Sequence, residues 1–198
     1  MRHATPSTTG KAMRSMAAAL ALLGVLQALP PAWHEALRFD RQALLRGELW
    51  RLWTGHLVHL GWAHAALNAA GLVVCALLAD RPPTTRTLLR CFALLGAGIS
   101  VLFLALQPQL AYYVGLSGVL YGLFVLVLWP GVRRADPIGI AALCAIAAWL
   151  GWQLLRGPAR AEEALIGGDI IVQAHVYGVA CAIAMLAAAS VRKAWPAR

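Results

Sequence analysis

Apolar residues run through this 198-residue chain in long stretches that few charges interrupt. Six stretches approach the length that a helix needs to cross a bilayer whose hydrocarbon core is about 30 Å thick. They are residues 16–29, 57–79, 88–106, 116–129, 138–155 and 170–191, of which the first and fourth are short. Prolines stand between them, at Pro30, Pro31, Pro82, Pro83, Pro108, Pro130 and Pro158. Because proline interrupts a helix interior, the pattern predicts breaks there and an all-α polytopic membrane protein with six transmembrane helices.

The composition agrees with a membrane protein. Hydrophobic residues make up 61% of the chain and charged residues 13%, and the mean hydropathy is +0.68. A soluble domain carries about 25% charged residues. The length leaves no room for a separate soluble module, so residues 1–198 are predicted to form a single membrane domain.

Neither the net charge of +9 nor the cysteines indicate a second function. The basic residues are spread through short connectors and form no stripe, which argues against a nucleic-acid partner. The cysteines lie in apolar runs at wide spacings, at Cys75, Cys91, Cys144 and Cys181. This pattern gives neither a disulfide framework nor a zinc site, and it leaves the redox compartment undetermined.

The charges predict which side of the membrane each connector faces. With six spans, both termini and the connectors 80–87 and 130–137 share one side, and this side, with Arg90, holds eleven basic residues against two acidic ones. The opposite connectors hold six basic and six acidic residues, so the whole net charge lies on one face. The positive-inside rule makes that face cytoplasmic, with both termini inside.

The first stretch has a competing interpretation. Lys11 and Arg14 precede a short apolar run, and residues 28–36 could hold a cleavage site, as in a signal peptide. Removal of that segment would leave the remaining topology unchanged. Residues 32–54, where tryptophans stand among charges, are predicted to form an interfacial structure on the outer face.

Polar residues inside the predicted spans are candidates for a functional site, because polar groups are costly in lipid. Counted along helices that start at the outer face, His64 lies roughly 10 Å deep, Asn68 one turn deeper on the same face, and His175 roughly 8 Å deep. The helix from Ser117 to residue 129 is only about 20 Å long, so Ser117 is expected to begin a short fourth helix about 10 Å below the outer surface. The uncharged residues 107–115 are then expected to dip above a small aqueous pocket.

A serine and a histidine at one depth form a candidate catalytic pair. Each residue also has an ordinary interpretation, since a serine at a helix start is often an N-cap and a buried histidine often a packing residue. Together, His175 can take the hydroxyl proton of Ser117 while the serine attacks a carbonyl. His64, Asn68 and the free N–H groups at the start of the fourth helix could stabilise the oxyanion. No carboxylate lies within a predicted span, so a dyad is expected rather than a triad.

Two other sets of residues have more than one interpretation. His56, His59 and His64 invite a zinc interpretation, but His64 points to another face and no cysteine or carboxylate stands nearby, so neither a metal nor another cofactor is expected. His59 is better explained as a structural group of the outer segment. Trp149 and Trp152 are expected to pack inside the protein, with a side entrance for a substrate helix as the alternative.

Five short motifs in this order resemble those of rhomboid intramembrane serine proteases, across roughly residues 48–182. They are Glu48-Leu49-Trp50-Arg51, His64-Ala65-Ala66-Leu67-Asn68, Gly115-Leu116-Ser117-Gly118, Tyr121, and Ala174-His175-x-x-Gly178. The resemblance implies a six-helix rhomboid core with Ser117 and His175 as the catalytic dyad. It implies that Gly115, Leu116, Gly118, His64 and Asn68 bind the substrate or the oxyanion and that the ring of Tyr121 packs on the catalytic histidine. Trp50, Arg51 and Gly178 would be structural.

One residue departs from the family pattern, since Ala182 stands where a second glycine is usual after Gly178. Packing of small residues between the fourth and sixth spans is still expected, at slightly greater separation. Residues 51–64, together with the compact size, resemble the rhombosortase subgroup. That resemblance implies removal of C-terminal Gly-Gly-type (GlyGly-CTERM) membrane tails from exported bacterial proteins, with membrane-anchored proteins and the bilayer as partners and the oligomeric state open.

Two rival functions remain. A non-catalytic rhomboid relative that binds membrane segments would typically lack the serine or the histidine, and both are present. A small transporter would use His64, Asn68 and His175 as a polar path. The lack of intramembrane carboxylates and of an inverted repeat argues against it.

Overall fold

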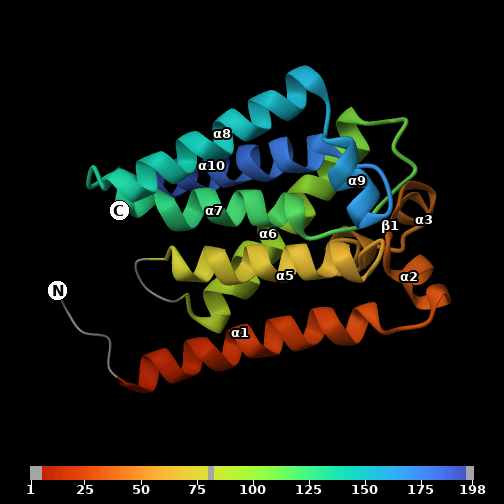
Figure 1. The fold of residues 1–198 in the computed structure, drawn as a ribbon, viewed down its shortest axis with the longest axis horizontal. Coiled ribbons are helices and arrows are strands. Elements are labelled where there is room, and N and C mark those ends of the chain that lie inside the picture. Colours follow the sequence, from red (N-terminus) through yellow and green to blue (C-terminus); the bar gives the residue numbers. More distant parts are fainter. Residues whose placement is uncertain (1–5, 80–82, 195–198) are drawn as a thin grey trace.

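The computed structural model describes residues 6–79 and 83–194. Four charged residues of the predicted cytoplasmic face, Arg2, Asp80, Arg81 and Arg198, and Pro82 of a predicted break lie outside these ranges. The described part is mainly helical (Figure 1). Its elements are α1 (Pro6–Gln27), α2 (Pro31–Leu37), β1 (Phe39–Asp40), α3 (Arg41–Leu45), α4 (Arg51–Thr54), α5 (Trp62–Leu77), α6 (Thr85–Leu106), β2 (Tyr112–Tyr113), α7 (Ser117–Val132), α8 (Pro137–Arg156), α9 (Arg160–Ile166) and α10 (Val172–Ala194).

Helix α7 is the centre of the bundle. It packs against α10, α8, α5 and α6, and Figure 1 shows it between α5 on one side and α8 with α10 on the other. Its sequence is apolar on every side, as expected of a helix surrounded by other helices. Half of its residues are buried, among them three glycines that allow close approach of neighbours.

Three helices begin at the same end of the bundle. Figure 1 shows α5, α7 and α10 running in one direction and α6 and α8 running in the opposite direction. His64 is the third residue of α5, Ser117 the first of α7 and His175 the fourth of α10. The topology therefore gathers the candidate site residues at one end, and the start of α1 and the end of α10 lie at the other (Figure 1).

The segment above this end is folded rather than loose. β1 pairs antiparallel with β2, which joins the outer segment to the residues that precede α7. The Arg41 guanidinium donates to four carbonyl oxygens at and just after the end of α6, those of Phe103, Leu104, Gln107 and Leu110. The Phe103 and Gln107 oxygens also accept the N–H groups of Gln107 and Leu110, and Arg41 adds charged donors that cap the last turn of α6. The predicted dipping segment 107–115 is thus held by a strand pairing and by an arginine.

Part of the predicted set has the length and the hydropathy of membrane-spanning helices. Among the described residues, α6, α8 and α10 are long and apolar enough to cross a bilayer, and α1 with α2 forms a pair bent by 117°. α5 and α7 are apolar but have 16 residues each, about 24 Å of helix. The six long helices match the six predicted stretches, and the number that cross the bilayer stays a prediction.

Three expectations were wrong. The second predicted span begins as a helix at Trp62 and not at residue 57, because Gly61 is extended (φ −171°), so the depth of His64 cannot be counted along a helix from residue 57. Pro130 does not break the fourth helix, since it lies near the C-terminal end and costs only one backbone hydrogen bond. Trp149 and Trp152 do not pack inside, because both lie on the outer face of α8, with 44% and 55% of their surfaces exposed.

Candidate active site

Ser117 follows a sharp turn at the start of α7. Gly115 has a φ of +123°, a left-handed backbone that favours glycine. The Tyr113 hydroxyl donates to the Gly115 carbonyl at 2.8 Å, and the Gly115 N–H donates to the Gly55 carbonyl at 3.0 Å. The N-cap position belongs to Leu116, and no side chain caps the helix, so the ordinary capping role does not explain the serine.

The structure brings Ser117 and His175 into direct contact. The Oγ of Ser117 lies 3.0 Å from Nε2 of His175. One turn after Ser117, the ring of Tyr121 stacks on the imidazole, with centroids 4.3 Å apart and planes at 12°. A serine within hydrogen-bond reach of a neutral imidazole can attack a carbonyl carbon while the imidazole takes its proton.

Close helix packing sets this distance. A Cβ on Gly118 would lie 2.8 Å from the Ala174 carbonyl oxygen, and one on Gly178 would overlap the Gly118 carbonyl oxygen. The backbones of α7 and α10 therefore touch where both positions lack side chains. Ala182, the departure from the family pattern, is fully buried and lies one turn beyond this contact.

His64 presents a donor beside the serine turn. Its Nδ1 accepts the Leu60 N–H at 3.4 Å, so the neutral ring carries its proton on Nε2. A Cβ on Gly115 would lie 2.8 Å from that Nε2. Asn68, one turn on, donates from Nδ2 to the His64 carbonyl at 3.0 Å. Both side chains are buried, and the first turn of α7 adds backbone N–H groups with no acceptor one turn earlier.

These groups share one cavity of about 190 Å³. Its wall includes Ser117, His175, His64, Asn68 and Tyr121, together with apolar side chains and two acids near α9, Glu162 and Asp169. Burial and the neighbouring Glu163 raise the pKa of Glu162. In residues 6–79 and 83–194, no three His, Cys, Asp or Glu side chains converge as metal ligands do.

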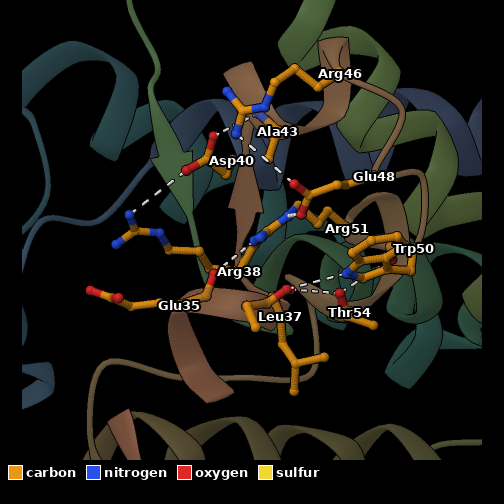
Figure 2. A network of polar contacts seen from close by, with 11 residues as sticks. Glu35, Leu37, Arg38, Asp40, Ala43, Arg46, Glu48, Trp50, Arg51 and Thr54 are labelled. Carbon is orange, nitrogen blue, oxygen red and sulfur yellow. Dashed lines mark hydrogen bonds and ion pairs between the residues drawn. The ribbon is translucent and has the colours of Figure 1, made fainter. Parts of the chain in front are cut away.

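Trp50 and Arg51 lie outside the cavity, in the folded outer segment. Figure 2 shows Arg51 among the polar groups of this segment, with its guanidinium toward Glu48 and toward the backbone at Arg38. It donates to the carbonyl oxygens of Glu35 and Arg38 at 2.7 and 2.9 Å and to the Glu48 carboxylate at 2.8 Å. The Trp50 indole donates to a carbonyl of α2 at 3.2 Å. Both side chains thus tie α4 to the segment before it.

A second serine–histidine contact occurs away from the cavity. Nε2 of His56 lies 3.1 Å from both the Ser100 hydroxyl oxygen and the Gly96 carbonyl, and the Ser100 hydroxyl donates to the Leu52 carbonyl at 2.9 Å. Both side chains are at most 1% exposed, and burial lowers the pKa of His56 to about 4. This pair fastens the outer segment to α6 and has no space for a substrate.

Sequence reasoning missed one residue that touches the dyad. Gln153 of α8 is 2% exposed, and its Oε1 lies 3.3 Å from Nδ1 of His175. A signal was available, because Gln153 is the one amide in the apolar stretch 138–155, where polar groups need a reason. Sequence spacing could not show that it faces His175, since the two residues belong to different helices.

Comparison with known proteins gives a family match and a related protein. The family model described as "Rhomboid domain" matches residues 46–192, which include both members of the serine–histidine contact in the cavity. A protein of Bacillus subtilis (strain 168) named "Putative rhomboid protease YdcA" is 26% identical over 149 residues, covering 74% of this chain and 70% of that protein.

Proposed function

Because the chain belongs to the rhomboid family, we propose that it is an intramembrane serine protease that cleaves membrane-anchored proteins, with Ser117 as nucleophile and His175 as base. Membership of this family, and the similarity of the chain to a protein named as a protease, support peptide-bond hydrolysis by a multi-pass membrane protein. The observation that carries the proposal is the 3.0 Å contact between Ser117 Oγ and His175 Nε2, inside a cavity.

The proposed reaction is an acyl transfer to serine followed by hydrolysis. Ser117 Oγ bonds to the carbonyl carbon while its proton moves to Nε2 of His175. The peptide C–N bond then breaks, and the leaving amine takes that proton. Water, deprotonated by the same imidazole, releases the acyl group and restores the hydroxyl.

The oxyanion of each tetrahedral intermediate needs donors that are already in place. The proposed donors are Nε2–H of His64, the remaining Nδ2–H of Asn68 and backbone N–H groups at the start of α7, beside Leu116 and Gly118. The short distance of 2.8 Å from Nε2 of His64 to the place of a Cβ on Gly115 supports this, since Gly115 stands two residues before the nucleophile. Both His64 and Asn68 line the 190 Å³ cavity that also holds Ser117, which supports a shared role.

For the substrate, we propose the tails suggested by the rhombosortase-like segment 51–64, namely C-terminal Gly-Gly-type membrane anchors of exported bacterial proteins. Three residues of that segment, Arg51, His56 and His59, are buried, and Arg51 and His56 make hydrogen bonds within the protein. The resemblance therefore includes residues that stabilise the fold. With such substrates the protein would lie as a single domain in the bacterial inner membrane. The charge distribution supports cytoplasmic termini and a cavity open toward the periplasm.

A fluorophosphonate probe tests the chemistry. Wild-type protein in detergent micelles should be labelled and Ser117→Ala should not. Ser100→Ala is the matched control, because it removes the other serine that contacts a histidine and should leave labelling intact. Equal labelling of wild type and Ser117→Ala would overturn the proposal and would favour a binding protein or a transporter.

A reporter protein tests the substrate. A periplasmic reporter with a Gly-Gly tail anchor should be released in cells that express the wild type and retained with Ser117→Ala. A matched reporter whose Gly-Gly pair is replaced by Leu-Leu should stay anchored. Release of both reporters would contradict the proposed specificity and leave the protease assignment standing.

A further inference from the structure

Gln153 is an unusual residue on an otherwise lipid-facing helix. Of the 20 residues of α8, only Gly139, Leu150 and Gln153 are buried. A buried amide in an apolar helix must find partners, because an unpaired polar group loses its solvation without compensation. Its Oε1 has one, His175 Nδ1, while its Nε2 has none in the described part of the chain. A half-satisfied buried amide calls for an explanation other than stability.

The geometry points to a positioning role: Gln153 holds the imidazole of His175 in the tautomer and orientation that let it act as base. This inference rests on the proposed function. To accept the proton of Ser117, the neutral ring must have a free lone pair on Nε2 and its own proton on Nδ1. The amide oxygen at 3.3 Å accepts that proton and so favours this tautomer over the other.

Stacking alone cannot do this. The Tyr121 ring fixes the plane of the imidazole, but it has no acceptor at the ring edge that could choose between the two nitrogens. Gln153 contacts that edge from a different helix, so α7 fixes the plane and α8 fixes the tautomer. The other titratable groups that line this cavity are His64, Tyr113, Glu162 and Asp169.

An amide is the chemistry that suits this place. A carboxylate would also accept from Nδ1, but it would have to be buried as a charge on a helix that faces lipid. A glutamine accepts the same proton without that cost. The base is thereby oriented by a neutral group, so it does not need the carboxylate that a catalytic triad supplies.

Three variants separate this role from packing. Gln153→Met keeps the volume and removes the acceptor, and Gln153→Glu keeps the acceptor and adds a charge. Leu150→Met, a buried change one turn away on α8, is the packing control. The first readout is the pH dependence of the rate at which fluorophosphonate labels Ser117. The second is the ¹⁵N NMR shifts of protein labelled with ¹⁵N-histidine. The His175 signals are assigned as those that are missing from the spectrum of His175→Ala.

We expect Gln153→Met to lower the labelling rate roughly tenfold, the effect of one lost hydrogen bond on the reacting state. Its His175 signals should move from the Nδ1–H tautomer toward a mixture. Gln153→Glu should keep the labelling and shift the acidic limb of the pH profile to higher pH, because a carboxylate favours the protonated imidazole. Leu150→Met should match the wild type in both readouts.

The inference is overturned if Gln153→Met keeps the wild-type tautomer, or if it loses no more labelling than Leu150→Met. The NMR readout does not depend on catalysis. If wild-type protein is not labelled at all, the proposed function fails, and the tautomer of His175 in Gln153→Met still decides whether Gln153 positions the ring.

Discussion

The imidazole of His175 lies flat against the phenol ring of Tyr121, with planes at 12° and centroids 4.3 Å apart. Tyr121→Phe keeps this stacking and should label with fluorophosphonate at nearly the wild-type rate. Tyr121→Ala removes the supporting ring and should lower the rate by roughly threefold to tenfold, the value of one aromatic pair. Equal labelling rates for the two variants would show that the stacking does not hold the base.

The turn before Ser117 depends on a glycine. Gly115→Ala forces a side chain into a left-handed backbone and toward His64. It should lower the unfolding free energy by about 1–3 kcal/mol and should also reduce labelling of Ser117. Gly151→Ala is the control, because Gly151 lies inside α8 with no atom near its Cβ position. It should be neutral or slightly stabilising, as alanine favours helices. Chemical denaturation in micelles measures both, and equal stability of the two variants would refute the argument.

The contact between α7 and α10 makes a prediction about two small residues. Gly178→Ala places a methyl group against the Gly118 carbonyl, so α10 must move and carry His175 away from Ser117, which should abolish labelling. Ala182→Gly restores the usual family residue and only removes a buried methyl, at about 1 kcal/mol, and labelling should persist. Undiminished labelling of Gly178→Ala would mean that the close approach of α7 and α10 does not determine the distance between Ser117 and His175.

Arg51 stabilises the outer segment through three charge-assisted hydrogen bonds. Arg51→Ala should lower the unfolding free energy by about 2–3 kcal/mol, because it removes all three bonds, two of them to partly buried carbonyl groups. Arg46→Ala is the control, since its ion pair to Glu48 is exposed and 3.9 Å long, and should change stability by less than about 0.5 kcal/mol. A thermal scan in micelles that finds similar losses would assign Arg51 no special role.

The sequence predicts the helices better than it predicts their boundaries. Hydrophobic runs indicate where helices lie, but hydropathy does not distinguish residues 57–61 from the helix that follows. There the extended backbone of Gly61 and the bond from the Leu60 N–H to His64 delay the start of α5. Pro130 shows the reverse error, because the cost of proline depends on its distance from the helix end.

The candidate site followed from motifs on three separate helices, and the structure brings those residues to one cavity. The sequence could not predict contacts made by residues outside the motifs. Examples are the contact of Gln153 with His175 and that of Arg41 with the end of α6. Trp149 and Trp152 show the same limit. In lipid a large aromatic residue is as stable outside a bundle as inside, so hydrophobicity does not indicate which way it faces.

The shallow burial of α8 has a consequence for the whole protein. This helix is held by few buried residues, and one of them, Gln153, also contacts the base. A small sideways displacement of α8 in the bilayer would therefore part the amide from the imidazole before the Ser117–His175 contact changed. On the proposed function, the reactivity of Ser117 would then respond to the lateral pressure of the lipids around α8, and membrane composition would affect the rate.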